Sequence, residues 1–223
     1  MTNASRSALV AAGAAVVVLV GCLVFAYSLR PPSTSTAAPR ETTAEEGLRC
    51  GSAVCRSVLK QVVGDDAVEV LVGSGTGRIK VTGPAGPNIF ESSVVESGAV
   101  VDDSSLQCVP AAVSVCLVRG RKGDISYGEV LVERSGAWTR TQAPYVATGG
   151  YLALHDVDGD QVADLVAVQR PCDPTGCKRL YAQVFSFSGT PVLGCTSSVT
   201  ALDDLPGWPE VAPRGDDLHS CGA

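Results

Sequence analysis

The stretch VCLVRGRKGDISYGEVLVERSGAW, residues 115–138, has two apolar runs separated by a polar loop and closed by a turn at Gly136. Short runs rich in β-branched residues are typical of strands, and the loop between them predicts a β-hairpin. The same order recurs in EVLVGSGTGRIKVTGPAG, residues 69–86, and in LVAVQRPCDPTGCKRLYAQVFSFSGTPV, residues 165–192. The sequence therefore predicts three similar hairpin units.

The three units have a regular spacing. Their closing glycines, Gly83, Gly136 and Gly189, are separated by 53 and 53 residues. A fixed period of roughly 20 to 50 residues indicates an array of repeated structural units, and four-stranded β-propeller blades have a period near this one. Because a propeller usually needs at least about four blades, we expect an all-β fold of about three repeats. It is either a set of propeller-like blades or a curved β-sandwich.

The rest of the folded region follows the same pattern. Further strands are predicted at AVEVLV, RIKVT, NIFESSVV, VSVCLVR, YGEVLVER, AWTRTQ, YLALH, DLVAVQ, LYAQVFSF and PVLG, and nothing after residue 64 predicts a long helix. Residues 48–64 differ, because Val54, Val58 and Val62 recur every four residues and predict a short helix.

The N-terminal part predicts a membrane anchor. Residues 8–29 carry no charge and are long enough to cross a hydrocarbon core of about 30 Å as one transmembrane helix, which makes residues 1–29 the anchor. The alternative is a lipoprotein signal, because LVGC, ending at Cys22, resembles a lipobox; the apolar run continues past Cys22, which favours the uncleaved helix. Residues 30–47 are rich in Pro, Ser and Thr and predict a disordered linker.

The cysteines predict the compartment of the remaining domain, residues 48–223. Eight cysteines follow the apolar run: Cys50, Cys55, Cys108, Cys116, Cys172, Cys177, Cys195 and Cys221. An even number in a domain of this size indicates disulfides outside the cytoplasm, and the spacings do not fit a zinc site. The sequence leaves about a hundred disulfide pairings open. The order of the cysteines along the chain favours pairs of neighbours: Cys50 with Cys55, Cys108 with Cys116, Cys172 with Cys177, and Cys195 with Cys221. Together with the predicted anchor, these cysteines predict a single-pass cell-membrane protein whose C-terminal domain lies outside the cytoplasm.

Charge excludes one class of partner. The chain has 17 basic and 23 acidic residues, and without Arg6 and Arg30 the part beyond the membrane has 15 − 23 = −8 charges. Such a surface repels nucleic acid and gives divalent cations a favourable field. Arginine outnumbers lysine and Ala, Val and Gly are abundant, a composition typical of a high-GC bacterial genome.

One acidic loop predicts a metal site. In LALHDVDGDQVADLVAVQR, residues 152–170, carboxylates occupy positions one, three, five and nine of a loop, and a backbone carbonyl is available at position seven. The predicted ligands of one calcium ion are Asp156, Asp158, Asp160, the Val162 carbonyl and Asp164, since calcium takes about six to eight oxygens. An EF-hand is disfavoured, because Gln161 replaces its glycine and Ala167 its glutamate.

These residues carry a family resemblance. DVDGDQVADLVAV, residues 156–168, resembles the calcium loop of FG-GAP repeats, the blades of integrin-α-type β-propellers and of related bacterial surface proteins. The resemblance implies a propeller blade of about 50 residues and calcium bound by the aspartates named above. Gln161 departs from the glycine of that family, and a positive φ there would cost about 1 kcal/mol.

A second resemblance points to an enzyme. LALHDVDGD is similar to the first motif of haloacid-dehalogenase-type phosphatases, which would make the first aspartate a nucleophile beside magnesium. Only a little more than a quarter of the chain follows Asp164, too little for the required α/β domain, and Asp160 replaces the threonine of that motif. The chain has two histidines and none of the common nucleophile motifs. We therefore expect no catalytic residues and no enzymatic activity.

Three other features are better explained without a site. His155 is expected to pack beside the acidic loop, and GSGTG, residues 73–77, to form a hairpin turn rather than a phosphate loop. The tripeptide of Arg214, Gly215 and Asp216 is expected in a flexible tail. The sequence therefore predicts a membrane-anchored, calcium-binding β domain that recognises an envelope protein or polysaccharide. The alternative is a structural or assembly subunit of an envelope complex with no ligand of its own.

Overall fold

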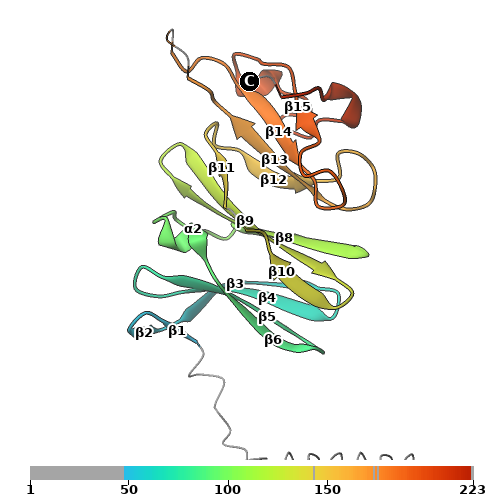
Figure 1. Ribbon diagram of the computed structural model, residues 1–223. Helices are drawn as coiled ribbons and strands as arrows, with labels where there is room; N and C mark the ends of the chain where they lie inside the picture. Colours follow the sequence, from blue (N-terminus) through green and yellow to red (C-terminus); the bar gives the residue numbers. More distant parts are fainter. Residues whose placement is uncertain (1–47, 143, 173, 175, 222–223) are drawn as a thin grey trace, which may run out of the picture. The chain divides into compact units, whose positions relative to one another are not determined.

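Strands dominate the computed structural model, which describes residues 48–142, 144–172, 174 and 176–221. They form three antiparallel sheets and a separate hairpin of β1 (Arg49–Cys50) and β2 (Ala53–Val54) (Figure 1). The all-β prediction is confirmed, and none of the three sheets closes into a barrel. The predicted anchor (1–29), including Cys22, and the predicted linker (30–47) lie outside the described residues.

Each sheet follows the order of the chain. The first sheet contains β3 (Arg56–Val63), β4 (Asp66–Val72), β5 (Gly77–Gly83) and β6 (Gly86–Glu91). The second contains β7 (Leu106–Val109), β8 (Val113–Lys122), β9 (Ile125–Arg134) and β10 (Ala137–Arg140), with β11 (Tyr145–Ala147) also pairing with β9. The third contains β12 (Leu152–His155), β13 (Asp164–Gln169), β14 (Tyr181–Phe185) and β15 (Gly194–Cys195).

The predicted repeat is present in this topology. Gly83 ends β5, Gly136 lies between β9 and β10, and Gly189 lies between β14 and β15. All three glycines therefore occupy the connection from the third to the fourth strand of a sheet. In the described residues, each of the three sheets contains a four-stranded antiparallel meander, and the equally spaced glycines lie at the equivalent connection of each one.

The second sheet packs against both of the others. One apolar cluster joins it to the first sheet and includes Val70, Ile79, Val118, Leu131 and Trp138. A second cluster joins it to the third sheet and includes Leu117, Val130, Leu152, Leu154 and Leu165. Because both faces of β8 and β9 are covered, their sequences are continuous apolar runs rather than alternating ones.

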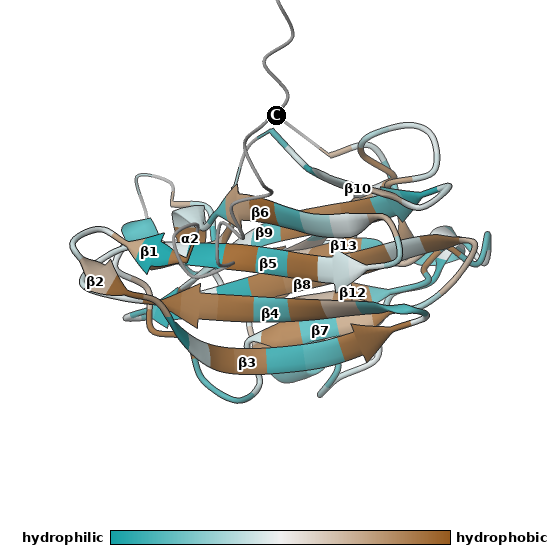
Figure 2. Ribbon diagram, turned by 90° about the horizontal axis from the view of Figure 1, so that it is seen from below, coloured by the Kyte–Doolittle hydropathy of each residue, from teal (hydrophilic) through white to brown (hydrophobic). Residues whose placement is uncertain are grey.

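The outer faces of the first and third sheets differ in what covers them. Glu69 on the outer face of the first sheet pairs with Lys60 at 2.9 Å and with Lys80 at 3.7 Å, and Val62 there is 68% exposed. Seen from below, hydrophilic segments lie among hydrophobic ones along β3, β4 and β5 (Figure 2), and buried residues alternate with less buried ones along much of β4 and β5. A solvated outer face is what a terminal repeat requires. The outer face of the third sheet is instead covered by the C-terminal segment, through Leu205, Val211 and Leu218.

Two sequence predictions are wrong in this region. Residues 48–64 form β1, β2 and β3 rather than a helix, because a spacing of four residues also fits the two-residue period of a strand. The predicted strand NIFESSVV is divided: β6 ends at Glu91 and α2 (Ser93–Glu96) follows. Ser92 caps this short helix by accepting a hydrogen bond from the Val95 amide at 3.4 Å.

All four neighbour disulfides predicted from the sequence are present. They join Cys50 to Cys55, Cys108 to Cys116, Cys172 to Cys177 and Cys195 to Cys221. Such a set is typical of an oxidising compartment and therefore of a domain outside the cytoplasm. No helix in the described part of the chain has both the length and the apolar character needed to cross a membrane.

Candidate metal centre

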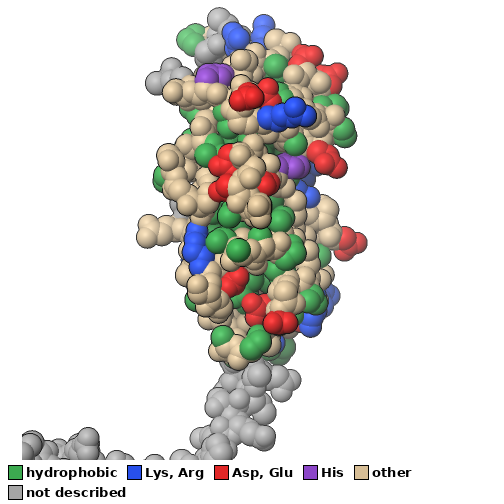
Figure 3. Space-filling view, turned by 90° about the vertical axis from the view of Figure 1, so that its right-hand side faces the viewer, with side chains coloured by type: hydrophobic (Ala, Val, Ile, Leu, Met, Phe, Trp, Pro, Cys, Tyr) green, Lys and Arg blue, Asp and Glu red, His purple; other side chains and the backbone are tan. Residues whose placement is uncertain are grey.

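The aspartate loop connects the first two strands of the third sheet. His155 at the end of β12 is paired with Asp164 at the start of β13, so the loop spans residues 156–163. Both flanking strands are apolar and mostly buried, and this burial fixes the two ends of the loop. Acidic side chains gather on this side of the third sheet (Figure 3).

Backbone amides fold the loop around its own carboxylates. Asp156 accepts hydrogen bonds from the amides of Gly159 at 2.8 Å and Gln161 at 3.2 Å. Asp158 accepts one from the Asp160 amide at 3.1 Å. Aspartate side chains commonly stabilise turns in this way. Each bond leaves carboxylate oxygens that can still bind a cation.

Gln161, at position six of the loop, has the positive φ that is strained for a residue with a side chain. Gln161 has a φ of 69°, in the left-handed region where a side chain costs roughly 1–2 kcal/mol. Gly159 has a φ of 79°, which glycine adopts without this cost. The loop therefore keeps its curvature at Gln161 despite the missing glycine.

Three of the four predicted carboxylates converge. Asp156, Asp158 and Asp164 each bring one oxygen into a group whose members all lie within 4.8 Å of one another. Asp156 and Asp158 are exposed, whereas Asp164 is buried. The site is thus open to solvent on one side and closed by Asp164 on the other.

Asp164 is the most unusual member of the group. Its Oδ2 accepts a hydrogen bond from the Val157 amide at 3.0 Å, while Oδ1 is buried and has no hydrogen-bond partner among the described residues. Burial, aided by the negative charge of Asp158, raises the pKa of Asp164 to about 6. The Ser186 hydroxyl opposes this rise slightly but makes no satisfactory hydrogen bond to Oδ1. An unpaired buried acceptor typically costs about 1–3 kcal/mol.

Asp160 does not join the three converging oxygens. It accepts a hydrogen bond from the Val162 amide at 2.8 Å, and a hydrogen bond from the Ser188 hydroxyl is the main reason that its pKa lies below the usual value. Ser188 belongs to the turn between β14 and β15. Sequence reasoning missed this neighbour, although Gly189 marks the same turn in the repeat.

Two further predicted residues flank the group. The Val162 side chain packs into the core between the second and third sheets, so only its carbonyl is available for the predicted role as a ligand. His155 accepts or donates a hydrogen bond with the Tyr151 hydroxyl at 2.9 Å, and the two rings are stacked. Burial lowers the pKa of His155. As predicted, it packs beside the loop, and it is not part of the carboxylate group.

The remaining candidates of the sequence analysis have structural roles. Residues 73–77 form the β4–β5 turn, closed by a bond from the Gly73 amide to the Thr76 carbonyl at 2.9 Å. The expectation of a flexible tail at Arg214–Asp216 is wrong. The Gly215 amide donates to the Val157 carbonyl at 3.1 Å and thus ties this segment to the aspartate loop.

The described residues form no parallel sheet and no helix longer than four residues. They therefore lack the α/β architecture that the resemblance to haloacid-dehalogenase-type phosphatases implies. Comparison with known family models, with curated proteins and with solved structures found no match. The site must therefore be interpreted from its own chemistry.

Proposed function

We propose that the aspartate loop binds one calcium ion, which holds the β12–β13 hairpin in place. The observation that carries this proposal is the buried, unpartnered Oδ1 of Asp164 in a carboxylate group with Asp156 and Asp158. A cation between these oxygens would satisfy Oδ1 and remove the repulsion among the carboxylates. A group made only of oxygen donors fits a hard cation rather than zinc or copper.

The wider proposal is a membrane-anchored module of the bacterial cell envelope that recognises an envelope protein or polysaccharide. Its support is the set of four disulfides together with the uncharged run at residues 8–29. Three meander sheets and one aspartate loop also agree with the resemblance to FG-GAP blades. Calcium acts structurally in this proposal and takes no part in a reaction.

Thermal unfolding of the detergent-solubilised full chain, with calcium and with a chelator, tests the calcium site. Calcium at 100 times its Kd should stabilise the fold by about 2.7 kcal/mol, or about 8 °C in Tm for a protein of this size. Metal analysis should find one calcium per chain. Asp203→Asn, an exposed acidic residue outside the loop, serves as the control and should respond as the wild type does. An unchanged Tm without bound metal would leave the alternative, an assembly subunit with no ligand.

A further inference from the structure

Two neighbouring cavities lie between elements of the second and third sheets, away from the aspartate loop residues. Their volumes are about 670 Å³ and about 230 Å³, and Arg121 and Gly150 line both. Lys122 and Arg170 also line the larger cavity, and Arg119 lines the smaller one. We refer to these four cationic residues and the cavities between them as the basic groove.

The basic groove reverses the charge of the chain locally. The whole chain has a net charge of −6, yet four cations line the groove and only Asp102 and Asp124 oppose them. The ion pairs among the described residues all lie elsewhere. Within the same described residues, the guanidinium groups of Arg121 and Arg170 have no hydrogen-bond partner. Unpaired cations gathered in a concave surface focus the field on an anion.

The backbone that carries Arg121 and Lys122 is fixed. Arg121 and Val100 exchange two backbone hydrogen bonds, at 2.9 Å and 2.8 Å. Nζ of Lys122 donates to the Ser97 carbonyl at 2.9 Å. Because this backbone is already ordered, an anion in the groove loses less free energy to loop entropy.

The opposite wall is a glycine turn that is fixed as well. The Gly149 amide donates to the Val168 carbonyl at 2.8 Å, and the Ser126 hydroxyl donates to the Gly150 carbonyl at 2.6 Å. Gly150 has a φ of 85°, and a Cβ there would lie 3.4 Å from Nη2 of Arg121. The nearest atom to such a Cβ would be the Asp124 carbonyl oxygen at 3.0 Å, so the positive φ and this close backbone both favour glycine in the turn.

We propose that the basic groove binds an anion that carries several phosphate groups. Guanidinium groups bind phosphate oxygens in a bidentate manner, and no described residue accepts a hydrogen bond from the guanidinium groups of Arg121 and Arg170. Three cations around the larger cavity exceed the charge that one carboxylate would neutralise. A soluble polyphosphate-type chain and a lipid headgroup share this chemistry. The groove uses none of the aspartate loop residues, so the proposal does not depend on calcium binding.

Calorimetric titration of inorganic tripolyphosphate into the full chain tests the proposal, with the chain in phosphatidylcholine nanodiscs and calcium-free buffer. Binding should be saturable and should weaken as salt is added. The double substitution R121Q/R170Q should weaken it by about tenfold or more, because it removes two charge-assisted contacts. The matched control is R56Q, an exposed arginine of β3. Equal affinity of R121Q/R170Q and R56Q, or no saturable binding, would overturn the proposal.

Two further measurements complete the test. The first distinguishes a lipid headgroup from a soluble ligand, and the second distinguishes anion binding in the groove from calcium binding in the aspartate loop. Co-sedimentation of the nanodiscs with cardiolipin vesicles, whose headgroup carries two phosphate groups, would identify a lipid headgroup if it is lost in R121Q/R170Q. Binding of tripolyphosphate alone would identify a soluble ligand. Vesicle binding that survives R121Q/R170Q, without tripolyphosphate binding, would contradict the groove. Asp164→Asn should leave tripolyphosphate affinity unchanged, which distinguishes failure of the calcium site from failure of the groove.

Discussion

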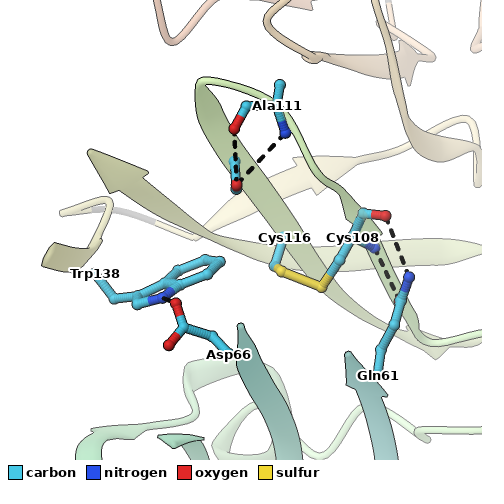
Figure 4. The surroundings of a disulfide bond; sticks show 7 residues. Gln61, Asp66, Cys108, Ala111, Cys116 and Trp138 are labelled. Atoms are coloured by element: carbon cyan, nitrogen blue, oxygen red, sulfur yellow. Dashed lines mark hydrogen bonds between the residues drawn. A yellow bond between two sulfur atoms is a disulfide. The ribbon is translucent and has the colours of Figure 1, made fainter. Parts of the chain in front are cut away.

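Gln61 and Cys108 are joined by two hydrogen bonds although they lie in different sheets. Nε2 of Gln61 donates to the Cys108 carbonyl at 3.2 Å, and the Cys108 amide donates to Oε1 of Gln61 at 3.0 Å (Figure 4). The side-chain carboxamide therefore pairs with β7 as the backbone of another strand would. This satisfies an edge of β7 that has no neighbouring strand.

Gln107 makes the same pair with Leu154 in the next sheet. Nε2 donates to the Leu154 carbonyl and the Leu154 amide donates to Oε1, both at 3.1 Å. Each pair spans 47 residues of sequence. The next equivalent position, 107 + 46 = 153, is Ala153, so the series of glutamine bridges ends at the third sheet. The repeat thus includes the contacts between sheets as well as the hairpins.

Gln107→Glu tests this bridge. The substitution keeps the size of the side chain, removes its N–H donor and places a carboxylate against the Leu154 carbonyl. We expect a loss of about 1–3 kcal/mol in the free energy of unfolding at neutral pH. Part of the loss should be recovered in acid, where the protonated carboxyl regains a donor. Urea denaturation at both pH values measures this effect.

The control for this prediction is Gln142→Glu, at an exposed position, where a change within about 0.5 kcal/mol is expected. If Gln107→Glu were equally neutral, the bridge would contribute no net stability. The same comparison at Gln61 would show whether both bridges are equivalent.

The hairpins could be predicted because each is a local pattern: two apolar runs, a polar loop and a glycine turn. β7 (LQCV) and β11 (YVA) were not predicted, because neither stretch forms an apolar run long enough to stand out from the polar residues around it. The glutamine bridges give no periodic signal, because a polar residue in a strand normally indicates an exposed face. Of the four aspartates, Asp160 lies outside the converging group and contacts Ser188. Ser188 comes from another hairpin, so this contact cannot be found from the loop alone.

The substitution Asp164→Asn tests two effects of the buried carboxylate: the folding stability that its burial costs, and its contribution to calcium binding. The amide removes the charge that burial disfavours, so we expect the metal-free domain to gain about 1 kcal/mol in stability. The stabilisation by calcium should largely disappear, because the buried carboxylate of the group is lost. Urea denaturation with and without calcium measures both effects on the same protein.

Asp160→Asn is the matched substitution within the loop. An asparagine oxygen can still accept the hydrogen bond from the Val162 amide, and the Asp160 carboxylate lies outside the converging group. We therefore expect most of the calcium stabilisation to remain. An equal loss in Asp160→Asn and Asp164→Asn would show that calcium recruits all four carboxylates and rearranges the loop.

The stability of the calcium-free domain should fall as pH rises through the range set by Asp164. Its folded-state pKa of about 6 lies above the usual aspartate value of about 3.9. Between these values the folded state binds more protons than the unfolded state, so acid stabilises the fold. We expect Asp164 to contribute a decrease of about 2 kcal/mol between pH 4 and pH 7, measured by urea denaturation as the difference between the wild type and Asp164→Asn.

Calcium should abolish this trend near neutral pH, because it stabilises the ionised form of Asp164 and its affinity rises with pH. Asp164→Asn, which has no titrating group at this position, should lack the decrease with and without calcium. Because the lowered pKa of His155 acts in the opposite direction in this range, the test is the difference between the two proteins. Metal-free wild type and Asp164→Asn with the same pH dependence between pH 4 and pH 7 would contradict the assignment of Asp164 as a buried, unpaired carboxylate.

The disulfide between Cys195 and Cys221 should contribute more to stability than the disulfide between Cys172 and Cys177. It closes 26 residues, and Cys195 and His219 exchange two backbone hydrogen bonds beside it, at 2.9 Å and 3.0 Å. The double substitution C195A/C221A should lower the free energy of unfolding by about 3.5 kcal/mol, because the unfolded chain gains entropy. The loss for C172A/C177A should be about 2 kcal/mol, because that disulfide joins cysteines only 5 residues apart.

The two variants should also differ in what they expose. Release of the C-terminal segment uncovers the apolar outer face of the third sheet, so C195A/C221A should bind a hydrophobic dye near its midpoint of unfolding while C172A/C177A should not. Release also removes the hydrogen bond from Gly215 to Val157, and calcium affinity should fall because the loop is less ordered. Equal losses of stability and no dye binding would mean that packing alone holds the segment on the sheet.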